Sequence, residues 1–442
     1  MIFKRKIYQE MLRWKKEEHG LSALLIKGAR RVGKSTIVEE FAKREYKSYI
    51  LIDFANTSKA INSLFDDISD LDYFFLRLET ETHTSLHRRE SVIIFDEVQR
   101  QPLARQAIKY LVKDGRYDYI ETGSLLTLKK NVQNIVIPSE EYRLTLHPLD
   151  FEEFLWAVNK EVRAEMLEKF VEMKKPLGET HRTLMRDLRL YMLIGGMPQS
   201  VDTYLKTNNL QSVDFTKRKI LDLYEDDFRK IDLTGSASRL FADIPAQLNN
   251  NASRYQVSSA TESRRTSYTD TVIADMEDSM VVFLAYHAND PNVGLGLSRN
   301  INKYKMFIID TGLFVTLAFR NKTFTENIIY NKLLSDKLEA NLGYVYENLV
   351  AQMLRAKGHE LYYYTFKTDS GKHNYEIDFI LTEGNKIIPI EVKSSGYKTH
   401  ISLDTFCDKF SSYIGKRYLL YTKDYQKDKQ TICLPIYFTP FL

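Results

Sequence analysis

Apolar positions along the chain fall into three successive patterns. Up to about residue 150, short apolar runs alternate with segments of helical spacing. The runs at 21–26, 92–95 and 117–121 predict strands, and residues 35–43 predict a helix. A strand without polar alternation is typical of a parallel sheet that is buried on both faces. This order of elements predicts a doubly wound α/β domain over residues 1–150.

The middle of the chain has a different pattern. From residue 151 to 240, apolar residues recur at helical spacing with many charged residues between them, which predicts a helical lid. Residues 241–320 predict short helices followed by two strands, at 281–286 and 305–309. Helices followed by a two-stranded wing indicate a winged-helix-like segment.

The last predicted domain spans residues 321–442. An amphipathic helix at 340–354 precedes two strands, at 375–381 and 386–393.

A complete G-x-x-x-x-G-K-[ST] motif, GARRVGKS, occupies residues 28–35 between a predicted strand and a predicted helix. Such a loop wraps phosphate groups with its backbone N–H groups. Lys34 would add a positive charge at the β- and γ-phosphates, and Ser35 would offer its hydroxyl to Mg²⁺. The sequence therefore predicts ATP and Mg²⁺ as cofactors. The predicted nucleotide-binding residues are Gly28, Ala29, Arg30, Arg31, Val32, Gly33, Lys34, Ser35 and Thr36.

Two carboxylates, Asp96 and Glu97, end the apolar strand at 92–95. Ligands bind at the carboxyl ends of the strands in parallel sheets. We expect Asp96 to hold Mg²⁺ and Glu97 to orient and deprotonate the water that attacks the γ-phosphate. Thr122 and Ser124 follow the third strand, and either can hold that water. Both residue types are equally typical of an ordinary turn at a strand end.

A second constellation lies in the last predicted domain, where Asp378 is followed by Glu391-Val392-Lys393. This is the D…(D/E)-x-K pattern of restriction-endonuclease-like folds. A period of two puts Glu391 and Lys393 on one face of their strand, and a hairpin would bring Asp378 beside them. Asp378 and Glu391 would hold Mg²⁺ or Mn²⁺, Lys393 would orient water, and Glu347 from the preceding helix would complete the set. Charged residues that alternate with apolar ones are also typical of any half-exposed strand.

Composition and net charge argue against a strongly basic, a disulfide-rich and a membrane-spanning protein. The 442 residues include 63 Lys and Arg against 59 Asp and Glu, so the net charge is only +4 and no broad field attracts nucleic acid. Two cysteines form no disulfide framework. No run approaches the roughly eighteen apolar residues of a membrane span. We therefore expect a cytoplasmic protein with no membrane partner.

The chain resembles the bacterial and archaeal AAA+-type ATPases that carry a C-terminal domain of unknown function with a restriction-endonuclease-like core. The resemblance covers nearly the whole length. Its marks are GARRVGKS at 28–35, FDEVQ at 95–99, TGS at 122–124, HPLDFEEF at 147–154, GGMP at 195–198, DTGL at 310–313 and IEVK at 390–393. It implies ATP binding, a helical lid, a winged-helix-like segment and a nuclease-like end. By analogy it also implies self-association to complete the ATPase site, with Arg143 in the place of an arginine finger.

Two functions stay open at the level of sequence. The first is an ATP-driven enzyme that acts on DNA, with the last domain cutting or gripping it. The second is an ATP-switched regulatory or assembly protein whose nuclease-like domain is catalytically inactive and serves binding. The presence of Asp378, Glu391 and Lys393 favours the first function, and the even charge favours the second.

Overall fold

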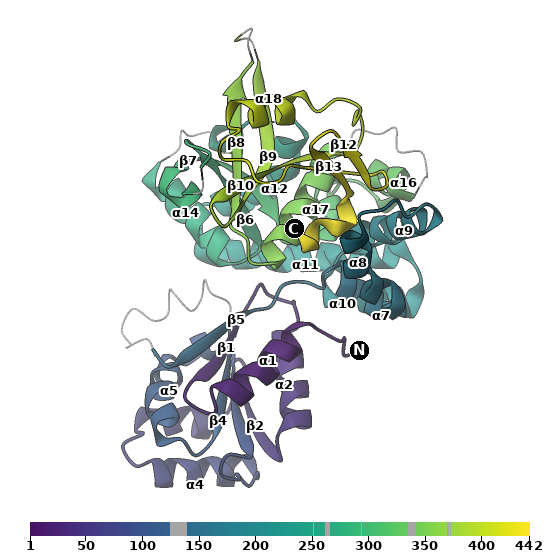
Figure 1. The fold of residues 1–442 in the computed structure, drawn as a ribbon. Helices are drawn as coiled ribbons and strands as arrows, with labels where there is room; N and C mark the ends of the chain where they lie inside the picture. Colours follow the sequence, from purple (N-terminus) through teal and green to yellow (C-terminus); the bar gives the residue numbers. More distant parts are fainter. Residues whose placement is uncertain are drawn as a thin grey trace. The chain divides into compact units, whose positions relative to one another are not determined.

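The computed structural model describes residues 1–123, 139–250, 252–260, 266–292, 294–334, 342–368, 371 and 373–442. Contacts divide the chain into two compact units. The first consists of Met1–His147 and Asp278–Val281, and the second of Pro148–Glu277 and Val282–Leu442. Each unit is built on one β-sheet (Figure 1).

The first unit contains a five-stranded sheet of order β2-β3-β4-β1-β5. All neighbouring strands in it run parallel, which confirms the predicted α/β domain. Its strands are β1 (Ala23–Lys27), β2 (Ser48–Asp53), β3 (Ser91–Asp96), β4 (Asp118–Gly123) and β5 (Glu141–Thr145). Its helices are α1 (Ile7–Glu17), α2 (Lys34–Glu45), α3 (Lys59–Ser63), α4 (Leu71–Thr82) and α5 (Pro102–Asp114), with 3-10 turns η1 (Leu64–Asp66) and η2 (Val98–Arg100).

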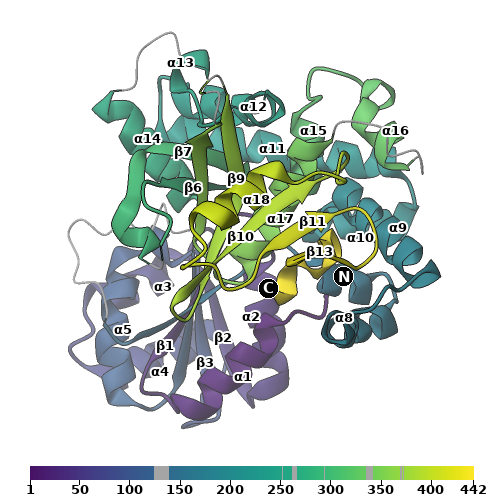
Figure 2. The same cartoon turned by 45° about the horizontal axis from the view of Figure 1, so that its top comes forward.

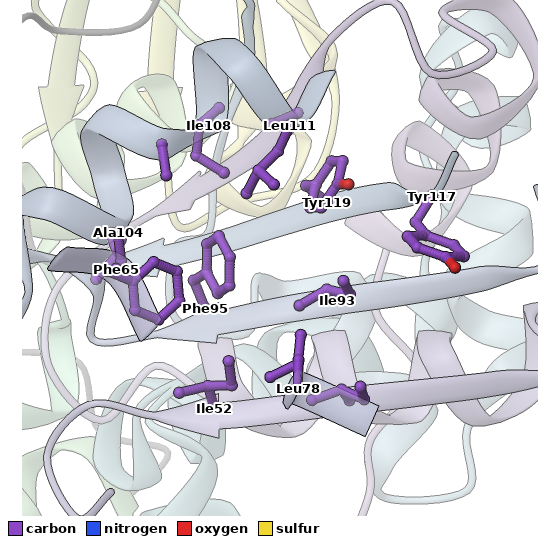
Figure 3. Packing of buried hydrophobic residues seen from close by; sticks show 14 of the residues in the cluster. Ile52, Phe65, Leu78, Ile93, Phe95, Ala104, Ile108, Leu111, Tyr117 and Tyr119 are labelled. Atoms are coloured by element: carbon purple, nitrogen blue, oxygen red, sulfur yellow. The ribbon is translucent and has the colours of Figure 1, made fainter. Parts of the chain in front are cut away.

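Helix α5 supplies much of the apolar cover of this sheet. Its residues Ala104, Ile108 and Leu111 point toward Ile93 and Phe95 of β3, as Figure 3 shows. Every residue of β3 is buried, as its unbroken apolar run predicts. The parallel order places the carboxyl ends of β1, β3 and β4 next to one another, where the predicted phosphate loop, the two carboxylates and Thr122 lie.

The second unit contains an eight-stranded mixed sheet of order β12-β13-β11-β10-β9-β8-β6-β7. Its strands are β6 (Val282–Ala288), β7 (Arg299–Ile308), β8 (Leu361–Lys367), β9 (Asn374–Glu383), β10 (Lys386–Lys393), β11 (Tyr418–Tyr421), β12 (Gln426–Asp428) and β13 (Thr431–Pro435). Figure 2 shows helix α18 (Ile401–Lys409) lying across β9 and β10, against which it packs.

Besides α18, the second unit contains a larger set of helices. They are α7 (Phe151–Ala157), α8 (Glu161–Met173), α9 (Glu179–Ile194), α10 (Pro198–Thr207), α11 (Leu210–Ile231), α12 (Ser236–Asn249), α13 (Val257–Ala260), α14 (Ser267–Asp278), α15 (Thr311–Leu317), α16 (Ile328–Leu334) and α17 (Gly343–Ala356), with 3-10 turns η3 (Leu295–Ser298), η4 (Phe324–Glu326) and η5 (Ile436–Phe441). The segment at 151–240 is therefore helical, while its role as a lid stays a prediction. Among the described helices, none is both long and apolar enough to cross a membrane.

The two strands expected as a wing do pair as an antiparallel hairpin, β6 and β7. However, β6 also pairs in parallel with β8, so the hairpin forms one edge of the eight-stranded sheet. The expectation of a separate wing is wrong for this hairpin. The reason is that β6 is buried along nearly its whole length and pairs at its second edge with β8, a strand of the last predicted domain.

Three motif segments, far apart in the sequence, meet in the interior of the second unit. Gly196 donates its N–H to Asp310 Oδ2 at 2.6 Å and accepts the N–H of Leu149 at 2.7 Å. A Cβ on Gly196 would lie 2.0 Å from the Leu149 oxygen, and one on Gly195 would lie 2.3 Å from Asp310 Oδ1. A Cβ on Gly312 would lie 2.6 Å from the Gly195 Cα. We call these five residues the glycine junction.

Helix α17 ties the glycine junction to the sheet. The Gln352 side chain accepts the Thr311 N–H at 2.8 Å and donates to the Tyr191 hydroxyl at 2.8 Å. That hydroxyl in turn donates to the Leu149 oxygen at 2.7 Å. The buried Lys217 ammonium donates to the Gly312 oxygen at 3.0 Å. Helices α9, α11, α15 and α17, together with Leu149 just before α7, thus share one polar core.

Candidate nucleotide site

The phosphate loop has the backbone conformation that its glycines permit. Gly33 has φ +95° directly before α2 begins at Lys34, a left-handed conformation that favours glycine. A Cβ on Gly28 would lie 2.4 Å from the Leu146 oxygen. Both glycines are therefore required by the fold of the loop, whatever the loop binds.

Lys34 lies inside the loop, with only 6% of its surface exposed. Its ammonium donates to the oxygens of Gly28 and Ala29, each at 3.0 Å. Burial lowers the pKa of Lys34, against the opposing effect of Glu97 and Asp96. Two carbonyl oxygens of the loop thus hold the charge in place, and the next two residues, Ser35 and Thr36, are exposed.

Asp96 joins three elements at the end of β3. Its Oδ1 accepts the Ser35 hydroxyl at 2.9 Å and also accepts the Thr122 hydroxyl from β4. The Thr122 oxygen accepts the N–H of Glu97 at 3.3 Å. A hydroxyl and a carboxylate oxygen this close are the hard ligands that Mg²⁺ takes, so Ser35 and Asp96 fit the metal expected here. Thr122 is fully buried in contact with Asp96, and Ser124 lies outside the described residues.

Glu97 is held by a neighbour that the motif analysis did not single out. Its backbone has φ +54°, and its Oε2 accepts the Gln99 amide at 2.6 Å. Gln99 is 3% exposed, so this contact is shielded from water. The FDEVQ motif at 95–99 contained Gln99, and its spacing of two from Glu97 was the available signal.

Arg5 braces the loop from outside the motif. Its guanidinium donates to the Val32 oxygen at 3.2 Å and to the His147 oxygen at 2.5 Å. Arg5 is buried, and it connects the phosphate loop to His147, the last residue of the first unit's N-terminal segment. Nothing in the sequence pattern around Arg5 indicated this contact.

Arg143, the candidate arginine finger, lies on β5 and is half exposed. Its guanidinium pairs with Glu141 Oε2 at 3.0 Å within the same strand. The other oxygen of Glu141 pairs with the buried Arg105 of α5 at 2.7 Å. Arg143 is therefore placed by its own unit, and its role toward a second subunit stays a prediction.

A buried acid lies one residue before Thr122. Glu121 on β4 is fully buried, and burial, together with the nearby Glu141, raises its pKa to about 8 against the effect of Arg105. Both oxygens of Glu121 are enclosed by protein without an assigned hydrogen-bond acceptor or donor. Burial therefore favours the protonated, uncharged form of this carboxyl.

In the second unit, the structure brings Asp378 and Glu347 together. Carboxylate oxygens of Glu347, Glu376 and Asp378 all lie within 4.8 Å of one another. The buried Lys305 ammonium from β7 contacts Glu347 at 2.8 Å and Glu376 at 2.5 Å. Burial and the two neighbouring carboxylates raise the pKa of Asp378, and Lys305 opposes that rise. Sequence analysis missed both Lys305 and Glu376.

Glu391 and Lys393 form a separate group. Their side chains contact each other at 3.2 Å, and the Lys393 ammonium donates to the Thr399 oxygen. Burial raises the pKa of Glu391, while Lys393 and then His400 lower it. This group faces α18 and the segment before it, where Thr399 and His400 lie.

The two groups lie on opposite faces of the sheet. Ile377 and Ile387 belong to the apolar cluster beneath α18. Alternation along β9 then turns Glu376 and Asp378 away from α18, whereas alternation along β10 turns Glu391 toward it. The expected convergence of Asp378 with Glu391 and Lys393 is therefore wrong.

The physical reason is a β-bulge in β9. Tyr362 of β8 is opposite Ile380, but Tyr364 is opposite Ile377, so β9 carries one extra residue between these pairs. An extra residue reverses the face on which the preceding side chains lie. Asp378 therefore points away from Glu391, although the register of β9 with β10 is regular up to Phe379.

Comparison with known families matches three segments of the chain. Residues 21–155 match an AAA domain, residues 185–323 a domain of unknown function (DUF8612), and residues 342–439 another domain of unknown function (DUF4143). The second match extends across residue 240, where we expected a domain boundary. No curated protein matches the sequence.

Three solved structures illustrate how distant the similarity is. The Walker-type ATPase paby2304 of Pyrococcus abyssi is 15% identical over 72% of this chain and 96% of its own, with a TM-score of 0.43. Cdc6p from Pyrobaculum aerophilum is 10% identical over 76% and 96%, with a TM-score of 0.25. PCH-2 of C. elegans is 13% identical over 48% and 65%, with a TM-score of 0.25. The family match and the site geometry together assign an ATPase-like AAA domain to residues 21–155.

Proposed function

We propose that the first unit binds and hydrolyses Mg·ATP at residues 28–36. One observation carries this proposal: a single oxygen of Asp96 accepts hydroxyls from Ser35 and Thr122, at the meeting point of α2, β3 and β4. A buried lysine lies inside the adjoining loop. These groups belong to three separate segments, and their assembly at one edge of a parallel sheet is typical of a phosphoryl-transfer site.

Each side chain has a distinct task in the proposed reaction. Lys34 exchanges its bonds to the loop oxygens for the β- and γ-phosphate oxygens. Ser35 and Asp96 hold Mg²⁺, which neutralises charge that develops on the phosphates. Glu97, fixed by Gln99, orients the attacking water and takes its proton.

The test is a set of matched variants measured for ATP binding and for turnover. Lys34→Ala should abolish binding, because the described part of the loop offers no other buried cation. Glu97→Gln should retain binding and lose turnover by about 10²-fold, the usual scale of lost general-base catalysis. Lys43→Ala, on the exposed end of α2 and paired only with Glu39, and the exposed Glu90→Gln are the controls. Equal ATPase rates in wild type and Glu97→Gln would exclude the assigned base.

For the second unit, we favour the ATP-switched regulatory or assembly function over a nuclease. The observation that favours it is the separation of Asp378 from Glu391 and Lys393 by the bulge in β9. Two carboxylates on opposite faces do not share one metal ion. The acidic side chains near Asp378 are also partly neutralised by Lys305.

A nuclease assay tests this choice. Full-length protein with ATP and either Mg²⁺ or Mn²⁺ should cut neither DNA nor RNA above the level of an Asp378→Asn variant. Cleavage that Asp378→Asn and Lys393→Ala both abolish would show that the two groups act together, and would restore the nuclease function. Binding of DNA without cleavage would leave the domain a role as a DNA-binding module.

A further inference from the structure

A groove on the first unit, away from the phosphate loop residues, has the properties of a docking surface. It has a volume of about 730 Å³ and lies between α5 and the segment from η1 to the start of α4. Its apolar lining consists of Phe65, Ile68, Leu71, Leu103, Ala107 and Tyr110. We call this surface the α5 groove.

One face of α5 runs along the groove. Its residues Leu103, Ala107 and Tyr110 follow the i, i+4, i+7 spacing of a helical stripe. Leu103 and Tyr110 are 41% and 48% exposed, which is unusual for large apolar side chains in one stripe. The lining extends to Asp114, so the groove accompanies about three turns of helix, or roughly 16 Å.

The rim of the groove is acidic. Residues 66–72 contain four aspartates and no lysine or arginine. Asp66 and Asp67 from this segment line the groove and are exposed, and Asp114 lines it from α5. Lys113 is the single cation in the lining. Asp114 is itself paired with Arg116 at 2.8 Å, so the negative charge around the apolar floor comes from Asp66 and Asp67, against Lys113.

From these observations we infer that the α5 groove binds a basic amphipathic helix of a partner protein. The apolar floor fits the hydrophobic stripe of such a helix, and the length of the groove fits three of its turns. The aspartates complement lysines or arginines at the flanks of that stripe and disfavour an acidic helix. This inference does not depend on the proposed ATPase, because the residues of the groove make no part of the phosphate site.

A designed peptide can test the inference on full-length protein. The probe is a fluorescein-labelled 14-residue helix of leucine and lysine with an amphipathic repeat, and its binding is followed by fluorescence anisotropy. A leucine–glutamate peptide of the same repeat and a scrambled leucine–lysine peptide are the controls. Only the amphipathic basic peptide should bind, and its binding should weaken as salt is raised.

Variants then locate the bound peptide. Tyr110→Lys, and separately the pair Asp66→Lys and Asp67→Lys, should each weaken binding about tenfold or more, as expected for central contacts of an interface. Leu76→Lys is the matched control: Leu76 is 62% exposed on α4 but does not line the groove, and its variant should bind as wild type does. Unchanged ATP binding in each variant shows that the first unit is folded.

Three outcomes would overturn the inference. The first is equal binding of the acidic peptide. The second is wild-type affinity in both Tyr110→Lys and the double aspartate variant. The third is a dimer in sedimentation that Tyr110→Lys dissociates, because the groove would then be occupied by a second copy of this chain.

Discussion

The fully buried Glu121 makes the stability of the first unit depend on pH. Its pKa lies at about 8, against a usual value of 4.5. Between these two values, the unfolded chain has released the proton while the folded unit retains it. Unfolding therefore releases a proton, and the free energy of unfolding falls as pH rises through this window, by at most about 1.4 kcal/mol per pH unit.

We expect Glu121→Gln to flatten this dependence, because glutamine keeps the shape of the side chain but carries no titrating proton. Urea unfolding at several pH values, followed by Trp14 fluorescence in a Trp156→Phe background, measures the slope. Glu140→Gln, at a side chain that is only partly buried, is the control and should leave the slope unchanged. The same slope in Glu121→Gln as in wild type would assign the pH dependence to other groups.

The sequence predicted those site residues that occur at a fixed spacing within one short motif. Lys34 begins α2 after the phosphate loop, Asp96 ends β3 and Glu97 follows it, in the order that the two motifs predict. Arg5 and Lys305 were missed because their partners lie on other segments of the chain. Such contacts depend on sheet order and helix packing, which local patterns do not encode.

Among the elements, the glycine junction fixes how the helices of the second unit pack. We expect Gly196→Ala to lower the free energy of unfolding of that unit by on the order of 3 kcal/mol or more, or to prevent folding. The added methyl group would lie 2.0 Å from the Leu149 backbone oxygen, and backbone cannot yield as a side chain does. Urea unfolding followed by Trp156 fluorescence measures the effect.

Gly296→Ala is the matched control for this prediction. A Cβ on Gly296 would lie 3.5 Å from the Tyr362 hydroxyl, an ordinary contact distance. Its variant should unfold within about 1 kcal/mol of wild type. Equal stability of Gly196→Ala and Gly296→Ala would show that the junction yields, and that its close contacts do not constrain the fold.

The strands show where prediction from pattern ends. The apolar run at 92–95 predicted both the position and the burial of β3, because a strand that is covered on both faces consists mainly of apolar residues. In β9, the alternation was also recognised, but one extra residue before Ile380 reversed the face of Asp378. No residue type in β9 marks the bulge, so the face of the sheet on which Asp378 lies could not be predicted from the sequence.

The covalent segment at 146–149 joins the two units, and we predict that nucleotide binding affects the second unit through it. The Leu146 N–H donates to the Lys27 oxygen beside the phosphate loop, and the Leu149 N–H donates to Gly196 of the glycine junction. Three peptide units span at most about 11 Å. Because the segment is this short, we expect a movement of Leu146 beside the phosphate loop to displace Leu149 as well.

We expect a non-hydrolysable ATP analogue to change deuterium uptake at residues 190–200 as well as at the phosphate loop. Mass spectrometry of the exchanged peptides measures this. Insertion of two glycines between His147 and Pro148 should leave ATP binding intact and remove the effect at 190–200, since the added length supplies slack. If saturating nucleotide leaves the deuterium uptake at residues 190–200 unchanged in wild type, this route is excluded.

The glycine junction also sets an order of events during synthesis. The phosphate loop and all five strands of the first sheet lie within the first 147 residues, whereas Gly196 finds its partner only when Asp310 has been made. These positions are 310 − 147 = 163 residues apart, which corresponds to on the order of ten to thirty seconds of translation. During that interval the phosphate loop has already been synthesised, whereas the helices around Gly196 still lack their hydrogen-bond partner Asp310. The segment that contains the phosphate loop is therefore synthesised well before Asp310 completes the glycine junction.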